Sequence, residues 1–338
     1  MAQNLSDHQF QQALKMIEVE TIGTEEKVEM LMQIAIGIQQ KPKSSEQLLQ
    51  AVKLYDQALS LCPDSEPLLR ARIEARKGTA FQAIQETGSR FLLQAQAQYE
   101  AALPVLNEYG QAEEVAEVEM NYGLVLQSLA GFNLVPLNTC ISAYQRSLRV
   151  FDRNKHPVEY AILHNNLATA FLAIPTSDER GKLREALAVQ SFEAALEVVN
   201  LIDHPSEYAM LQNNLGNALQ YVSSSHPAEN NLRALEAYDE ALKVRNRKDT
   251  PLEYANTISN KANCLRNLPD DPAHPLGGNR QHLLEARLLY REAQAVFEEY
   301  GDLAKVNVIM EVLQDVENEL GTGNTGSRNG KGFGEARI

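Results

Sequence analysis

One short pattern occurs three times in the chain, and this repetition limits the fold more than any other feature. The copies begin at His156, His204 and Thr250, so they are 48 and 46 residues apart. Each copy has Pro at its second residue, Glu two residues later and then Tyr-Ala. Pro loses no useful N–H at the first helical position, and Glu in the first turn complements the positive helix end. The repeats therefore predict helices that stack as similar units along the chain.

A second pattern marks a second helix in each repeat. A small residue, an aromatic residue four positions later and another small residue three positions after that share one helical face. We expect the small residues to let a neighbouring helix approach and the aromatic ring to fill the gap beside them. The aromatic residues of repeats one to six are Tyr55, Tyr99, Tyr144, Phe192, Tyr238 and Tyr290. The first helices of repeats two to six carry their own small residue: Gly78, Gly123, Ala168, Gly216 and Ala262.

The two patterns predict six helix pairs. A last helix at 302–320 would cover the exposed end of the stack, and a helix near 7–19 would cover the other end. Six of the 18 Gly lie in residues 321–338, which predicts a disordered tail. The expected domains are thus an N-terminal cap over 1–24, a repeat domain over 25–320 and the tail over 321–338. The expected pairs are 25–40 with 44–61, 67–87 with 90–107, 111–130 with 137–151, 157–174 with 181–201, 205–222 with 229–246, and 251–268 with 280–300.

These positions resemble the tetratricopeptide repeat (TPR). The turn between two helices is longer than in the usual TPR, because the small and aromatic positions are 21 to 28 residues apart. The Pro-x-Glu-Tyr-Ala and Asn-Asn-Leu segments are similar to two long subclasses. One is the kinesin-light-chain type, and the other occurs beside bacterial caspase-like proteases. The resemblance implies an all-α fold, a right-handed TPR-like α-solenoid of about six helix pairs with a C-terminal capping helix.

Composition excludes several classes of function. The chain has 31 basic and 45 acidic residues, a net charge of −14, which argues against binding to nucleic acid or an anionic membrane. Its longest apolar runs are four to five residues, too short for a membrane span. The first ten residues are polar and lack the apolar core of a signal peptide. Three distant cysteines do not form a disulfide framework. We expect a cytoplasmic protein.

No motif supports catalysis or a cofactor. Residues 321–326 spell Gly-x-Gly-x-x-Gly, but the dinucleotide-binding motif needs a strand before it and a helix after it. Here a predicted helix precedes the motif and a Gly-rich tail follows it. Four histidines precede Pro, and we interpret them as turn residues rather than metal ligands. We therefore expect no enzymatic activity, no cofactor and no metal site. The four histidines are His156, His204, His226 and His274.

Asparagines recur at fixed distances from the small residue of the first helices. Asn is a modest helix former, because its side chain competes for backbone hydrogen bonds. Its repeated use in the middle of helices therefore indicates a structural or binding role. In the TPR proteins that the chain resembles, the positions three before and one after the small residue face the concave groove. Three before lie Asn165, Asn213 and Ser259; two before lie Asn121, Asn166, Asn214 and Asn260; one after lie Thr169, Asn217 and Asn263.

Two roles for these amides stay open. They could clamp the backbone of an extended peptide, or they could form a ladder of hydrogen bonds between repeats. For the groove positions we favour peptide contact, while the position two before the small residue suits either role. A clamp for a carboxylate is disfavoured, because the groove positions hold no Lys or Arg. The expected partner-binding residues are Asn165, Thr169, Asn213, Asn217, Tyr221, Asn263 and Arg266.

The sequence therefore predicts a non-catalytic adaptor that binds a protein or peptide segment in its groove. By analogy with TPR proteins, such an adaptor would be a bacterial accessory factor or chaperone that holds one subunit of a larger enzyme during assembly or maturation. The alternative is a peptide-sensing regulator in a bacterial protease or signalling system.

Overall fold

The computed structural model describes residues 23–40, 42–173, 179–223, 226–271, 274 and 277–321. Over these residues the chain forms thirteen α-helices and no strand, which confirms the predicted all-α class. The chain divides into two compact units, a first unit of residues 1–152 and a second unit of residues 153–338. The predicted helix near 7–19 and the predicted tail beyond residue 321 lie outside the described residues, and the predicted domain boundaries stay predictions.

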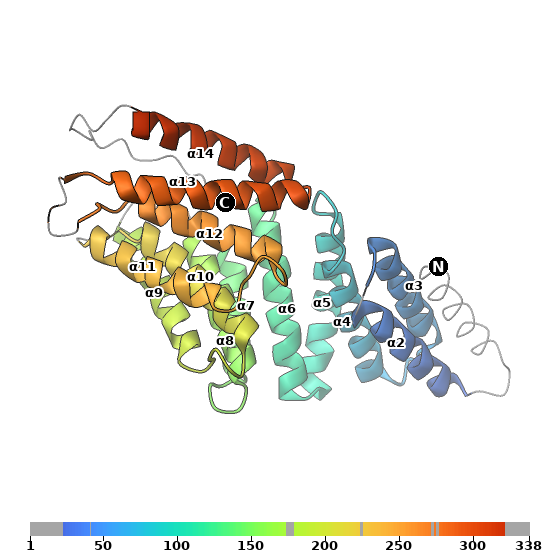
Figure 1. Ribbon diagram of the computed structural model, residues 1–338. Helices are drawn as coiled ribbons and strands as arrows, with labels where there is room; N and C mark the ends of the chain where they lie inside the picture. Colours follow the sequence, from blue (N-terminus) through green and yellow to red (C-terminus); the bar gives the residue numbers. More distant parts are fainter. Residues whose placement is uncertain are drawn as a thin grey trace. The chain divides into compact units, whose positions relative to one another are not determined.

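The first unit contains three helix pairs, coloured blue to green in Figure 1. The two helices of each pair pack together, and successive pairs meet where α3 contacts α4 and α5 contacts α6. The pairs are α2 (Thr24–Gln40) with α3 (Ser45–Leu61), α4 (Pro67–Gln82) with α5 (Arg90–Tyr109), and α6 (Ala112–Gly131) with α7 (Asn138–Ser147).

The second unit contains three further pairs and one last helix (Figure 1). Here α9 contacts α10, α11 contacts α12, and the last helix packs against α13. The six predicted pairs and the predicted last helix are thereby confirmed. The helices are α8 (Pro157–Leu172) with α9 (Glu179–Leu196), α10 (Pro205–Tyr221) with α11 (Pro227–Leu242), α12 (Pro251–Arg266) with α13 (Arg280–Glu299), and α14 (Leu303–Gly321).

The predicted helix starts are more accurate than the predicted ends. Helices α8, α10 and α12 begin at the Pro of each repeated segment, as expected. Four predicted ends, at 87, 151, 201 and 246, lie four or five residues too far. The apolar pattern runs on past the helix because the following turn also packs into the core. Phe151 after α7 and Val199 after α9 are both buried.

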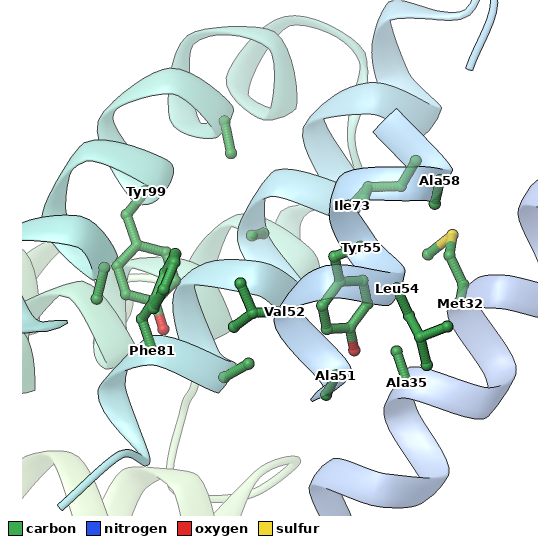
Figure 2. Packing of buried hydrophobic residues seen from close by; sticks show 14 of the residues in the cluster. Met32, Ala35, Ala51, Val52, Leu54, Tyr55, Ala58, Ile73, Phe81 and Tyr99 are labelled. Atoms are coloured by element: carbon green, nitrogen blue, oxygen red, sulfur yellow. The ribbon is translucent and has the colours of Figure 1, made fainter. Parts of the chain in front are cut away.

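The core explains why small and aromatic residues recur together. All six aromatic residues of the second helices are fully buried, and Figure 2 shows Tyr55 and Tyr99 among the buried side chains of the first unit. In repeats two, three and five the ring packs on the glycine of the first helix. A Cβ added to Gly216 would lie 2.6 Å from Cε1 of Tyr238, closer than van der Waals contact allows. The corresponding distance is 2.9 Å for Gly78 and 2.4 Å for Gly123.

Two further classes of feature are absent from the described part of the chain. None of its helices has both the length and the apolar character needed to cross a bilayer. Its His, Cys, Asp and Glu side chains nowhere gather into a group of three or more that could hold a metal ion.

Candidate functional site

The hydroxyl of each buried tyrosine reaches back to the first helix of its own repeat. A buried hydroxyl needs such a partner, because leaving it unpaired costs free energy. In repeats two, three and five the partners include a glutamine that lies four residues after the small residue of the first helix, and in repeat one Gln39 lies four residues after the buried Ala35. The bonds are Tyr55 to Gln39 at 2.9 Å, Tyr99 to Gln82 at 2.8 Å, Tyr144 to Gln127 at 2.7 Å, Tyr238 with Gln220 at 3.2 Å and with Asn217 at 2.7 Å, and Tyr290 to Asn263.

Repeat four departs from this arrangement at two positions. Phe192 stands where the other repeats have tyrosine, so no hydroxyl is present. Leu172 stands where repeats one, two, three and five have glutamine, so the amide is missing as well. Both side chains belong to the apolar core of the second unit. Repeat four thus replaces a polar contact between its two helices by an apolar pair.

The amides of five asparagines form a chain of hydrogen bonds across α12, α10 and α8, which we call the amide ladder. Asn260 Nδ2 donates to Asn213 Oδ1 at 3.3 Å, and Asn213 Nδ2 donates to Asn214 Oδ1 at 3.2 Å. Asn214 Nδ2 donates to Asn165 Oδ1 at 2.8 Å, and Asn165 Nδ2 donates to Asn166 Oδ1 at 3.3 Å. The ladder links three successive repeats through side chains 47 and 49 residues apart.

The amide ladder has one end in α12 and the other in α8. The ladder stops in α12 because Ser259 occupies the position of Asn213, and its hydroxyl donates to the carbonyl of Ala255 at 2.8 Å in the same helix. At the other end, Nδ2 of Asn166 is buried and has no partner among the described residues. One repeat earlier in the sequence, the position of Asn165 is held by Met120, which carries no amide.

A pocket opens beside the amide ladder in the second unit, and we call it the repeat-four pocket. It has a volume of about 240 Å³, which is slightly below the range of typical small-molecule sites. Leu172 supplies apolar surface, Phe192 borders the pocket as a fully buried ring, and Asn217, Asn214 and Asn260 supply amides. The complete lining is Thr169, Leu172, Phe192, Asn214, Asn217, Ala218, Tyr221 and Asn260, from α8, α9, α10 and α12.

Three of the seven predicted partner-binding residues line this pocket. Thr169 lies on α8, and its hydroxyl donates to the carbonyl of Asn166 at 2.9 Å. Asn217 uses its amide oxygen to accept the hydroxyl of Tyr238. Tyr221 is the last residue of α10, and it is 58% exposed although it is an aromatic residue. The structure therefore brings these three residues together at one surface opening.

The other four predicted residues are engaged inside the protein. Asn165 and Asn213 are only 8% and 7% exposed, and both belong to the amide ladder. Asn263 accepts the hydroxyl of Tyr290. Arg266 donates from Nε to Glu319 on α14 at 3.0 Å, so its charge holds the last helix in place. Partner contact by these four residues stays a prediction, and their present contacts are structural.

Five residues of the repeat-four pocket were not among the predicted partner-binding residues. Phe192 was assigned to packing alone, and Leu172 was not singled out. Asn214 and Asn260 were left open between two roles. The signal was present in the sequence, because repeat four lacks both the tyrosine and the glutamine of its neighbours. This signal can be interpreted only when the hydrogen bond between the tyrosine and the glutamine of the other repeats is known. The five residues are Leu172, Phe192, Asn214, Ala218 and Asn260.

The chemistry of the pocket is that of neutral hydrogen bonding. Among the described residues that line it, the phenol of Tyr221 is the sole ionisable group. The nearby thiol of Cys264 is fully buried, and burial raises its pKa to about 12, so it stays protonated. Burial lowers the pKa of His164. The arrangement can accept and donate hydrogen bonds through amides and can cover apolar surface.

Comparisons with known proteins return structural likeness alone. No protein-family model matches the chain, and no curated protein matches it. Among solved structures, it is similar to a Rap protein complexed with Competence and Sporulation Factor, at 12% identity and a TM-score of 0.39 over 94% of this chain and 86% of that one. It is also similar to the TPR2AB domain of yeast Sti1 in complex with pHSP90, at 16% identity and a TM-score of 0.26 over 86% and 98% of the two chains. The function proposed below rests on the pocket rather than on these likenesses.

Proposed function

We propose that the chain is a non-catalytic adaptor and that the repeat-four pocket holds a segment of a partner protein. The observation that carries the proposal is the composition of the pocket wall. Amides of Asn214, Asn217 and Asn260 stand beside the apolar side chains of Leu172 and Phe192. A peptide presents the same combination, because its backbone offers N–H and C=O groups and its side chains offer apolar surface.

The amide ladder supports this role by fixing the pocket wall. Asn214 donates to Asn165 and accepts from Asn213, so its orientation is set from two sides. Asn260 is set by its bond to Asn213. A wall whose polar groups are already oriented loses little conformational entropy when a partner binds. The ladder therefore preorganises the pocket wall, because the amides are already oriented before a partner binds.

Tyr221 supports the proposal from the rim of the pocket. Exposed tyrosines beside a concave apolar site are frequent hot spots of protein interfaces. The ring buries a large area on binding, and the hydroxyl forms a hydrogen bond with a polar partner. The role that we propose for the adaptor is to hold one subunit of a larger enzyme during assembly or maturation. This finer role comes from the analogy with TPR proteins.

Site-specific photo-crosslinking tests the proposal. A photoreactive benzoylphenylalanine is introduced in place of Tyr221, the protein is irradiated in an extract of its host cells, and the crosslinked peptide is identified by mass spectrometry. Tyr109 provides a matched control, because it also ends a helix and is 57% exposed. We expect one defined segment of one protein to crosslink from position 221 and not from position 109. Identical products from both positions would reject the pocket as the binding site.

A further inference from the structure

Repeat two contains the polar version of the contact that repeat four lacks. In repeat two the hydroxyl of Tyr99 donates to Oε1 of Gln82 at 2.8 Å and lies 3.1 Å from Oγ1 of Thr79. Repeat four keeps the threonine, as Thr169, but has Phe192 and Leu172 at the other two positions. The chain therefore shows directly how the repeat-four site would look with its polar groups restored.

The two replacements belong together physically. In repeat two the tyrosine hydroxyl and the glutamine amide pair with each other, and repeat four has neither group. With Phe192 and Leu172 both apolar, no polar group is left over at this contact. Both residues border the repeat-four pocket, where Leu172 is partly exposed and the ring of Phe192 is fully buried.

The pocket wall determines which side chain would fit. No Lys, Arg, Asp or Glu is among the described residues that line it. A charged side chain would therefore enter without a partner of opposite charge, which is costly in a site partly closed to water. The volume of about 240 Å³ is of side-chain size rather than of drug size. The amides of Asn214 and Asn217 stand at the same wall, where they can pair with the backbone on either side of an inserted side chain.

We propose that Phe192 and Leu172 make the repeat-four pocket selective for one uncharged apolar side chain of the bound segment. This inference rests on the proposed function and adds a specificity to it. The amides hold the backbone of the segment, and the apolar surface of Leu172, with the buried Phe192 ring in the same core, recognises a leucine-, isoleucine-, methionine- or phenylalanine-like side chain. Polar side chains are disfavoured because they would lose hydrogen bonds to water without gaining a partner at this surface.

Selection from a library of random heptapeptides displayed on phage tests the specificity. The full chain is the target, in wild-type form and as the double variant Phe192→Tyr with Leu172→Gln, which restores the side chains of repeat two. We expect the wild type to enrich peptides with an apolar residue at one fixed position, by about tenfold or more over polar residues, the discrimination typical of an apolar pocket. The double variant should still bind peptides through the amides but should lose that preference.

The outcomes separate this inference from the proposed function. If the double variant keeps the same apolar preference, or if wild-type peptides show no preferred position, the specificity is wrong and the adaptor function stands. If the wild type selects no peptide, both are wrong. The variant Leu172→Gln alone serves if the double variant does not fold, because Leu172 is only partly buried and a glutamine there can reach water; it should reduce the preference.

A matched control makes the reverse change in the first unit. The variant Tyr99→Phe with Gln82→Leu gives repeat two the side chains of repeat four and alters the same number of polar groups. It should leave the peptides selected by the wild type unchanged. Loss of the apolar preference in this control as well would show that the preference depends on general stability and would overturn the inference.

Discussion

The amide nitrogen of Asn214 donates a 2.8 Å hydrogen bond to Oδ1 of Asn165, which lies 49 residues earlier in the chain. The same bond recurs one repeat later, where Asn260 donates to Asn213 at 3.3 Å. In both cases the asparagine two before the small residue donates to the one three before it in the preceding repeat. The repeated Asn-Asn pair is therefore a device that joins neighbouring repeats. It also sets the amides that line the repeat-four pocket.

Asn213, at the centre of the amide ladder, should be the ladder residue whose substitution lowers stability most. We expect Asn213→Ala to lower the free energy of unfolding by roughly 2–4 kcal/mol, because Oδ1 of Asn214 and Nδ2 of Asn260 each lose their hydrogen bond to Asn213. Asn307→Ala on the exposed side of α14 is the control and should change stability by less than about 0.5 kcal/mol. Urea denaturation of both variants measures the difference. Equal small effects would show that the ladder contributes nothing to stability.

Substituting glycine by alanine should have opposite effects on the free energy of unfolding at two helical positions. Gly216→Ala should destabilise the protein by about 1–3 kcal/mol, because the new Cβ would overlap the ring of Tyr238. Gly37→Ala should stabilise it by about 0.5–1 kcal/mol, because the Cβ meets no atom within 4 Å and alanine is the better helix former. Thermal or urea melts measure both. A stabilised Gly216→Ala would contradict the packing of ring on glycine.

The hydroxyl and the aromatic ring of Tyr238 should make separate contributions to the free energy of unfolding. Tyr238→Phe should cost about 0.5–1.5 kcal/mol, because Asn217 and Gln220 lose a common partner. Tyr238→Ala should cost about 3–5 kcal/mol, because it also removes a fully buried ring. Denaturant melts of the two variants, measured together, give both values. Similar losses for the two would mean that the ring contributes little packing.

Stability of the first unit should depend on pH through Glu114. Hydrogen bonds from Arg72, at 2.7 and 2.9 Å, hold the pKa of Glu114 below its ordinary value of 4.5. A carboxyl whose pKa is lowered in the folded state stabilises it above the unfolded pKa, and this contribution is lost as the pH falls through the folded pKa. The stability advantage of wild type over Glu114→Gln should therefore be fully present above the ordinary pKa of 4.5 and should shrink as the pH falls below it.

Urea melts at several pH values measure this difference. Glu113→Gln, at an exposed neighbouring position in the first turn of α6, controls for the change in net charge. A difference for Glu114→Gln that stays constant with pH would show that the ion pair with Arg72 is not the source.

Helix content and pairing could be predicted from the sequence because their signals are local. Pro at the helix start, Glu in the first turn and the spacing of small and aromatic residues each depend on neighbours within a few residues. The ends of second helices were less predictable, since Phe151 and Val199 continue the apolar pattern after the helix has stopped.

The functional site was only partly predictable, because it depends on which side chains meet across repeats. Asn165 and Asn213 were expected to face a partner, yet they are buried and bonded to other asparagines. Their orientation depends on how adjacent first helices are rotated, which no single helix specifies. The pocket was more difficult to predict, because its signal is an absence. Phe192 lacks the hydroxyl, and Leu172 lacks the amide, that other repeats have at these positions.

Calorimetric titration of the crosslinked segment tests the central claim most directly. The segment identified from position 221 is synthesised and titrated into wild type, Tyr221→Ala and Tyr109→Ala. Both tyrosines are exposed to the same degree, so neither change should unfold the protein. We predict that Tyr221→Ala raises the Kd by about tenfold or more, as expected for an aromatic residue at the centre of a binding site, and that Tyr109→Ala leaves the Kd unchanged. An unchanged Kd for Tyr221→Ala would contradict the claim that the repeat-four pocket binds the partner.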